Sequence, residues 1–432
     1  MKKLLLILLC LPFIGFGQNF EFTFTGVVDD DGKCVQQTND GGYIITGCTE
    51  SISHDENVFL IKTNVYGIEE WRKDFGGLNW DVGESVRQTT DGGYVIAGTS
   101  YSPSFGDGDM YLIKVDGSGN EQWSKNFAPA SSYYTEGNSI QQTNDTGYII
   151  CGTSVVSDYN VYLVKTDVNG NEQWSQMFGG INFDEGKCVQ QTNDDGYIVS
   201  GHTWDLGNSF SDILLLKIDS NGNEQWNKSI GGLNYDVAEF VQQTNDGGYI
   251  ITGYTRDFSD TIGLTSDIYL VKTDENGNEL WSKTFGGFNV DEGKCIQQTN
   301  DGGFIIIGST RSFSNGDNDV YLIKTDGNGN EQWSKTFGGI GDDEGEYVQQ
   351  TSDGGYIVTG SSESFGSIEK EVYLIKTDGA GNVTSSFNIL NKRNIRLQKT
   401  VDLLGKESKP QKNIPFIEIY DDGTVEKKIT ID

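Results

Sequence analysis

Apolar and polar positions follow one pattern that recurs along most of the chain. Within residues 293–337, alternating residues at 293–299 lead into a tight Asn-Asp-Gly-Gly turn, and a continuous apolar run occupies 304–307. Two more short segments, 320–325 and 331–337, lie on either side of a second glycine-rich turn. Alternating and apolar runs of this length between tight turns predict four short antiparallel strands.

The same unit recurs about every fifty residues, a period typical of propellers and solenoids. Its most regular part is a turn, Asp-Gly-Gly in most copies, followed by an aromatic residue at Tyr43, Tyr94, Tyr148, Tyr197, Tyr249, Phe304 and Tyr356. No segment after the N-terminal apolar stretch keeps the apolar spacing of a helix. The predicted fold class is therefore all-β, a seven-bladed β-propeller of four-stranded antiparallel blades.

The seventh repeat lacks its own fourth strand, because Ser385 stands where Trp333 stands in the sixth. Residues 20–26 align with residues 281–287 and can supply the missing strand. We predict that this N-terminal strand closes the ring as the outer strand of the last blade, which leaves no open sheet edge. The rival closing strand, residues 383–389, matches less well.

Six repeats carry a tryptophan at one position, within the unit Asp-x-x-Gly-x-x-x-Trp or a diverged form of it: Trp71, Trp123, Trp174, Trp226, Trp281 and Trp333. This unit resembles the tryptophan-docking repeat of the pyrroloquinoline-quinone dehydrogenase-like propellers, over residues 20–385. The resemblance implies that each tryptophan packs between blades. The chain lacks the adjacent cysteine pair associated with many quinone-dependent dehydrogenases, so we expect no redox cofactor.

The N-terminus predicts export. Residues 1–17 combine a lysine-bearing start, an apolar stretch too short for a membrane span and a small-residue site, the pattern of a secretory signal peptide. Lipid anchoring through Cys10 is the alternative. We expect the propeller in residues 18–390, no transmembrane helix in the mature chain, and a small C-terminal β segment in residues 391–432.

The C-terminal segment differs from the repeats in charge, with nine Lys and Arg against seven Asp and Glu. Its Asp-Leu-Leu-Gly-Lys turn at 402–406 and the run Gly-Thr-Val-Glu-Lys-Lys-Ile at 423–429 resemble the C-terminal sorting domain of the type IX secretion system in Bacteroidetes. The resemblance implies a sorting or anchoring segment, contact with that secretion machinery, and a secreted or outer cell-surface location. A small accessory hairpin on the propeller is the alternative.

Charge and cysteine content exclude several classes of function. The formal net charge of −32 argues against nucleic acid and anionic membranes as partners, and favours a soluble protein that we expect to be monomeric. Three cysteines share one repeat position, which indicates a packing slot rather than a disulfide or zinc pattern: Cys34, Cys188 and Cys295.

Strand direction predicts that the blade links and the variable loops gather on one side of the ring, which we call face one, and the tight turns on face two. Trp80 and Trp204 lie in face-one segments and are candidates for ligand binding. A series of acids ends the blade links: Asp30, Asp81, Asp184, Asp236, Asp291 and Asp343. They predict either a funnel for a cation or polar ligand, or turn acceptors for backbone N–H groups.

Two further sets carry alternative interpretations. One lysine per third strand predicts a salt bridge between blades or a stem packed against the next sheet: Lys62, Lys114, Lys165, Lys217, Lys272, Lys324 and Lys376. Four loop carboxylates could supply oxygen ligands to calcium, the one cofactor that the sequence leaves open, without the spacing of an EF-hand: Asp107, Asp109, Asp317 and Asp319.

No catalytic motif stands out. The chain has two histidines, His54 and His202, too few for a familiar zinc site. The sequence therefore predicts a non-enzymatic binding module for a polysaccharide or a surface protein, acting through face one. The alternatives are a glycan-degrading hydrolase that uses face-one carboxylates and a purely structural surface-coat protein.

Overall fold

The computed structural model describes residues 19–24, 28–50, 56–102, 108–180, 183–204, 210–256, 265–365, 369–383, 397–401, 416–420 and 425–428. The predicted signal peptide lies outside these residues. Two compact units make up the chain, Met1–Phe387 and Asn388–Asp432. Throughout the described ranges the elements are strands, and no helix is present that could cross a membrane.

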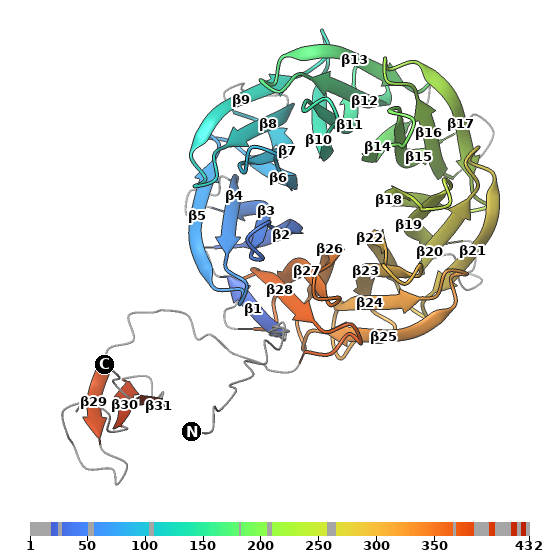
Figure 1. The fold of residues 1–432 in the computed structure, drawn as a ribbon. Coiled ribbons are helices and arrows are strands. Elements are labelled where there is room, and N and C mark those ends of the chain that lie inside the picture. The colour runs from blue at the N-terminus through green and yellow to red at the C-terminus, as the bar shows by residue number, and fades with distance from the viewer. Residues whose placement is uncertain are drawn as a thin grey trace, which may run out of the picture. The chain divides into compact units, whose positions relative to one another are not determined.

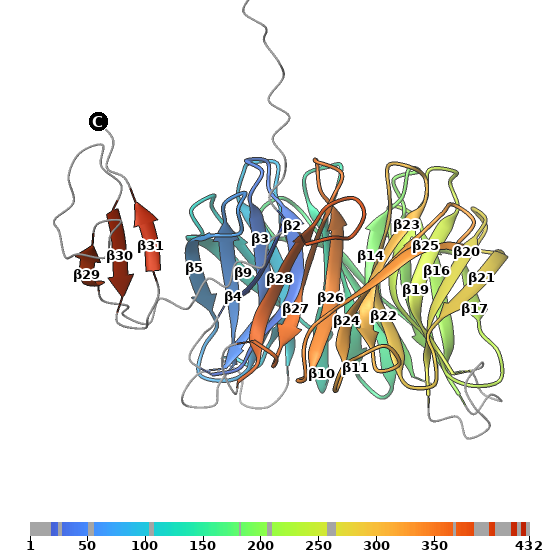
Figure 2. The same ribbon diagram turned by 90° about the horizontal axis from the view of Figure 1, so that it is seen from below.

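The first unit is a ring of seven four-stranded antiparallel sheets (Figure 1). Strands run in order from the axis to the rim, and loops gather at the two faces (Figure 2). The predicted seven-bladed propeller is confirmed. The first three blades contain β2 (Asp30–Gln37), β3 (Tyr43–Glu50), β4 (Glu56–Thr63), β5 (Glu69–Phe75), β6 (Asp81–Gln88), β7 (Tyr94–Ser100), β8 (Asp109–Val115), β9 (Glu121–Phe127), β10 (Tyr134–Gln142), β11 (Tyr148–Val155), β12 (Tyr159–Thr166) and β13 (Glu172–Phe178). The next three contain β14 (Asp184–Gln191), β15 (Tyr197–Thr203), β16 (Asp212–Ile218), β17 (Glu224–Ile230), β18 (Asp236–Gln243), β19 (Tyr249–Thr255), β20 (Asp267–Thr273), β21 (Glu279–Phe285), β22 (Asp291–Gln298), β23 (Phe304–Thr310), β24 (Asp319–Thr325) and β25 (Glu331–Phe337).

The seventh blade combines the two ends of the propeller sequence. Its strands, from the axis outward, are β26 (Asp343–Gln350), β27 (Tyr356–Ser362), β28 (Glu371–Thr377) and β1 (Phe20–Phe24). β1 pairs antiparallel with β28 and places Phe20 opposite Lys376, as Trp281 stands opposite Lys272 two blades earlier. The predicted closure by the N-terminal strand is confirmed.

The second unit contains one three-stranded antiparallel sheet. Its order is β29 (Leu397–Val401), β30 (Phe416–Tyr420) and β31 (Val425–Lys428). These strands occupy the C-terminal segment for which the sequence predicts a small β element. Its sorting function stays a prediction.

Burial along the strands explains the hydrophobic pattern. The middle strands β23 and β24 are buried at every position, because both of their faces pack against neighbouring blades. The outer strand β25 leaves its first two residues exposed. Apolar side chains from successive blades share one core, as Ile307 does with Val358 and Ile375.

Each repeated tryptophan contacts the next blade. The ring centroid of Trp226 lies 6.0 Å from that of Tyr249 in the following blade. A Cβ on Gly277 would come within 2.7 Å of the indole, and the φ of this glycine is 74°. Both the close contact and the positive φ therefore require glycine at this position of the turn. Equivalent ring pairs are Trp71–Tyr94, Trp123–Tyr148, Trp174–Tyr197, Trp281–Phe304 and Trp333–Tyr356.

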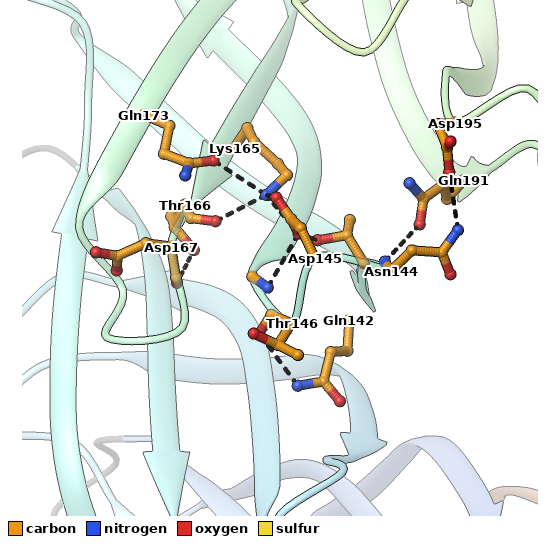
Figure 3. A network of polar contacts seen from close by, with 12 residues as sticks. Gln142, Asn144, Asp145, Thr146, Lys165, Thr166, Asp167, Gln173, Gln191 and Asp195 are labelled. Carbon is orange, nitrogen blue, oxygen red and sulfur yellow. Dashed lines mark hydrogen bonds and ion pairs between the residues drawn. The ribbon is translucent and has the colours of Figure 1, made fainter.

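A buried lysine holds the tight turn after each inner strand, and Figure 3 shows the example of Lys165 in the third blade. Lys165 Nζ lies 2.8 Å from Asp145 Oδ2 and donates to the carbonyl of Thr166 at 2.9 Å. Asp145 also accepts the N–H of Gly147, where a Cβ would lie 2.6 Å from the ammonium nitrogen. The expected salt bridge between blades is wrong, because each lysine pairs with the turn of its own blade. The other pairs are Lys62–Asp40, Lys114–Asp91, Lys217–Asp194, Lys272–Asp246, Lys324–Asp301 and Lys376–Asp353.

Glutamines link neighbouring blades at face two. The last Gln of each inner strand accepts a hydrogen bond from a backbone N–H in the turn of the preceding blade, as Gln191 does from Asn144 at 2.9 Å (Figure 3). Ser352 donates to Gln37 at 2.8 Å, which joins the last blade to the first. The remaining pairs are Asn39–Gln88, Thr90–Gln142, Asn193–Gln243, Asn245–Gln298 and Asn300–Gln350.

Replacing Trp226 by Ala should lower the free energy of unfolding by about 3 kcal/mol, because the change leaves a cavity between two blades. Trp80→Ala is the matched control: Trp80 is 56% exposed, and its loss should cost less than about 0.5 kcal/mol. Urea unfolding of both variants measures the difference. An equal loss in the two variants would contradict the role of Trp226 between blades.

Candidate functional site

Face one exposes large apolar side chains in the links between blades. In four links the residue after Gly-Gly projects into solvent: Leu78 is 86% exposed, Leu233 83%, Phe288 96% and Ile340 84%. Because these residues occupy the same position in different links, they are spread around one face of the ring. We call this set the apolar circle. The sequence pattern did not reveal it, although the recurring Gly-Gly-apolar unit is visible in the chain.

Aromatic side chains form a strip on the same face. It consists of Tyr159, Phe183, Trp204, Tyr235 and Phe210, whose neighbouring ring centroids lie 4.8–6.3 Å apart. These residues come from the third and fourth blades and from the links that follow them. Phe183 is 44% exposed and Trp204 37%. The structure therefore places the sequence candidate Trp204 within an aromatic strip that solvent reaches.

Trp80, the other tryptophan candidate, stands in the link between the first and second blades. Its side chain is 56% exposed, and its carbonyl accepts the N–H of Tyr101 at 2.8 Å. The link is thus anchored by the backbone, while much of the indole surface remains accessible to a partner.

The aspartates that begin the inner strands are buried and hold the blade links. Asp343 accepts the N–H of Gly339 at 2.8 Å and the hydroxyl groups of Ser362 and Ser364. Arg72 pairs with Asp30 at 3.1 Å. The same glycine N–H contact is made by Asp81, Asp184, Asp236 and Asp291. All six are at most 6% exposed, so this arrangement matches turn acceptors, the second of the two interpretations from the sequence.

The calcium candidates lie in different surroundings. Asp107 falls outside the described residues, and Asp109 accepts a long hydrogen bond of 3.4 Å from Asn126. Asp317 is exposed, whereas Asp319 is only 2% exposed. Where the chain is described, no three His, Cys, Asp or Glu side chains gather as a metal would require. Calcium binding stays a prediction.

A belt of charged side chains on and beside the inner strands was not foreseen from the sequence. Lysines and acids of neighbouring blades face each other in it, at 3.6 Å for Lys33 and Glu346 and at 3.8 Å for Lys294 and Glu239. Eight acids outnumber four lysines in this belt: Asp31, Glu84, Glu136, Glu185, Glu239, Glu292, Glu344 and Glu346, with Lys33, Lys187, Lys294 and Lys370.

Glu84 is a carboxyl group of the belt whose pKa is raised. Burial raises its pKa to about 7. The ammonium group of Lys33 opposes this shift in pKa, and the negative charges of Glu346, Asp31 and Glu136 add to it. Such a group changes its charge near neutral pH.

Two aromatic rings meet at the axis of the propeller. Phe240 and Tyr347 come from the fifth and seventh blades, yet their ring centroids lie 5.8 Å apart in an edge-to-face arrangement. The guanidinium group of Arg87, from the second blade, donates to the Tyr347 hydroxyl at 3.0 Å and lies over its ring. The cysteines at the same repeat position are buried free thiols: Cys34, Cys188 and Cys295.

A histidine-based catalytic site is not visible among the described residues. His54 lies outside them. Burial lowers the pKa of His202, whose Nε2 lies 3.7 Å from Glu185. Its Nδ1 has no hydrogen-bond partner in the described part of the chain, so a hydroxyl, imidazole and carboxylate triad is not assembled there.

No protein-family model matches the chain, and no curated protein matches it in sequence. Solved structures do match. A puromycin hydrolase gives a TM-score of 0.54 at 10% identity, covering 92% of this chain and 60% of the hydrolase, so the chain spans about three-fifths of that protein. YCF48 bound to a D1 peptide gives 0.48 at 9% identity, covering 84% and 96%. The likeness to the hydrolase shows the propeller fold alone.

Replacing Glu84 by Gln should stabilise the protein more at pH 8 than at pH 5. Folding raises the pKa of this carboxyl group from 4.5 to about 7, so stability falls as the pH rises through this window. The gain in the free energy of unfolding at pH 8 should stay below about 3 kcal/mol, because Glu84 is partly exposed and solvent screens its charge.

Thermal unfolding at the two pH values measures this difference. The control is Glu69→Gln on the exposed start of β5, which should change the stability by the same amount at both pH values. A Glu84→Gln effect that does not change with pH would show that the carboxyl group ionises normally.

Proposed function

We propose that this protein is an exported binding module that holds a partner protein on face one. The observation that carries the proposal is the apolar circle, whose four side chains are 83–96% exposed. Single exposed apolar residues are common, but a set repeated at one position of several links places apolar side chains around one face of the ring. A docked partner would remove this surface from water, a gain of about 25 cal/mol per Å².

The chemistry of the apolar circle favours a protein over a sugar as partner. Leu78, Leu233 and Ile340 are aliphatic and offer no flat face for a pyranose ring. Protein interfaces bury such side chains at their centre and surround them with polar groups. The neighbouring loops of face one vary in length between blades, which suits recognition of one particular partner.

A polysaccharide is the second candidate partner, and the aromatic strip is the observation that favours it. Trp204 and Phe183 present ring surface to solvent in a row that crosses blade boundaries. Aromatic faces of this kind stack on sugar rings, while neighbouring polar groups bind the hydroxyls.

Location follows from the two ends of the chain. The signal-peptide pattern of residues 1–17 supports export, and the likeness of residues 391–432 to a type IX sorting domain supports release at, or attachment to, the outer surface of a cell of the Bacteroidetes. The tryptophan contacts between blades fit the proposed kinship with tryptophan-docking propellers. Calcium, if bound by the loop carboxylates, would act as a structural ion.

We favour a binding role over an enzymatic or a purely structural role. The hydrolase activity named for one structural neighbour is not carried over, because a likeness at 10% identity concerns the fold. A coat protein would use face one for contacts with its own copies. The experiment below separates these possibilities.

Labelled full-length protein should bind saturably to washed cells of the organism that encodes it. Treatment of the cells with proteinase should abolish binding, whereas periodate, which destroys glycans, should leave it intact. The double variant Leu233→Ser/Phe288→Ser should bind at least about tenfold more weakly, since two exposed contacts of the apolar circle are lost.

The control is Val65→Ser/Ile68→Ser, which removes exposed apolar groups from a tight turn on face two and should bind normally. Binding that survives proteinase but not periodate, and that Trp204→Ala abolishes, would replace the protein partner with a polysaccharide. Absence of saturable binding would leave the coat role.

A further inference from the structure

A cavity of about 360 Å³ lies on the axis of the ring at the ends of the inner strands, beside the tight turns of face two. The aromatic pair at the axis contributes Phe240 and Tyr347 to its lining, together with Arg87. Glutamine side chains from six blades make up most of the remaining wall: Gln36, Gln141, Gln190, Gln242, Gln297 and Gln349. We call this cavity the axial cup. Its volume is within the range of pockets that bind small molecules.

The orientation of the six glutamines is fixed by the neighbouring blades. Each uses Oε1 to accept a backbone N–H from the next inner strand, at 2.5–2.7 Å, as Gln190 does from Gln243. A backbone N–H can only donate, so the atom that faces it must be the amide oxygen. The Nε2 group of each glutamine has no partner among the described residues. The wall of the axial cup therefore carries six amide groups whose donors remain available.

Arg87 takes the place of the seventh glutamine and adds a positive charge. Its guanidinium group donates to the Val86 carbonyl at 2.7 Å and to the Tyr347 hydroxyl at 3.0 Å, and it lies 3.1 Å from Cys34 Sγ. No carboxylate in the described ranges forms an ion pair with it. A partly buried cation without a counter-ion is costly, and an anion in the cup would compensate its charge.

We propose that the axial cup binds a small organic carboxylate. The cup offers amide donors and one guanidinium group, and a carboxylate accepts from both kinds of donor through two oxygens. One positive charge matches a monoanion better than a phosphate dianion, since a second negative charge would find no partner and the protein as a whole carries −32. The aromatic edge of Phe240 and Tyr347 suits a ligand with an apolar body. This site lies on the opposite face from the one proposed for the partner protein, and neither proposal depends on the other.

Isothermal titration of the full-length protein with sodium benzoate tests the proposal. Benzamide has the same shape without the charge, and inorganic phosphate supplies the charge without the carboxylate. We expect saturable binding of benzoate at one site, and binding of benzamide and phosphate at least about tenfold weaker, because hydrogen bonds to a charged group are the stronger ones.

Two variants locate the binding. Arg87→Gln restores the residue found in the other six blades and should weaken benzoate binding at least about tenfold. Gln190→Glu keeps an oxygen for the N–H of Gln243 and adds a negative charge to the wall, so it should also weaken binding. Arg311→Gln, which removes the same charge from an exposed loop of face one, is the matched control and should bind normally. Thermal unfolding checks that each variant is folded.

Several outcomes would overturn the proposal. Absence of saturable benzoate binding to the unaltered protein would exclude a carboxylate site in the axial cup. Benzamide that binds as tightly as benzoate would show that the charge of the ligand plays no part. Phosphate that binds more tightly than benzoate would show that the axial cup is a phosphate site rather than a carboxylate site. Unchanged binding in a folded Gln190→Glu or Arg87→Gln variant would place the ligand elsewhere.

Discussion

The packing of each blade's outer strand against the next blade is the contact on which this ring depends. A four-stranded blade cannot bury both faces of its middle strands alone, so stability arises at seven successive interfaces. At six of them an indole fits between an aromatic ring and a glycine of the next blade. At the seventh, Phe20 stacks on Phe22 with centroids 4.8 Å apart, and a Cβ on Gly67 would meet both rings. Two phenyl rings thus occupy the place of one indole.

The direction of the strands in each blade also determines how the two faces differ. On face two, the tight turn after each inner strand is tied to a lysine of its own blade and to a glutamine of the next, so many of its polar groups are already engaged. On face one, the buried aspartates satisfy the backbone of the links and leave the link side chains outside. Leu233 and Phe288 project from links whose backbone is fixed, which gives face one exposed apolar groups on a rigid support.

Much of the fold could be predicted from the sequence because the signals are local. The period of two, the glycine turns and the tryptophan spacing predict the blades, and the alignment of Phe20 with Trp281 predicts the closure. The candidate site was harder to predict from the sequence. A Leu or Phe after Gly-Gly resembles a core residue, and only the course of the link shows that it is exposed. A repeated lysine could equally have paired within or between blades, and the position of Glu84 between two glycine-containing turns does not reveal the acids of neighbouring strands.

Departures from the repeat mark the axial cup in this molecule. A residue that recurs in every blade serves the blade, as Lys165 serves its turn. Arg87, Phe240 and Tyr347 instead replace the residues usual at their positions, and they meet at the axis although they belong to three separate blades. At the axis each blade contributes a side chain at the same height, so one substitution alters a shared site while the outer interfaces stay unchanged. The axial cup can therefore acquire a charge such as that of Arg87 without loss of the contacts that hold the ring together.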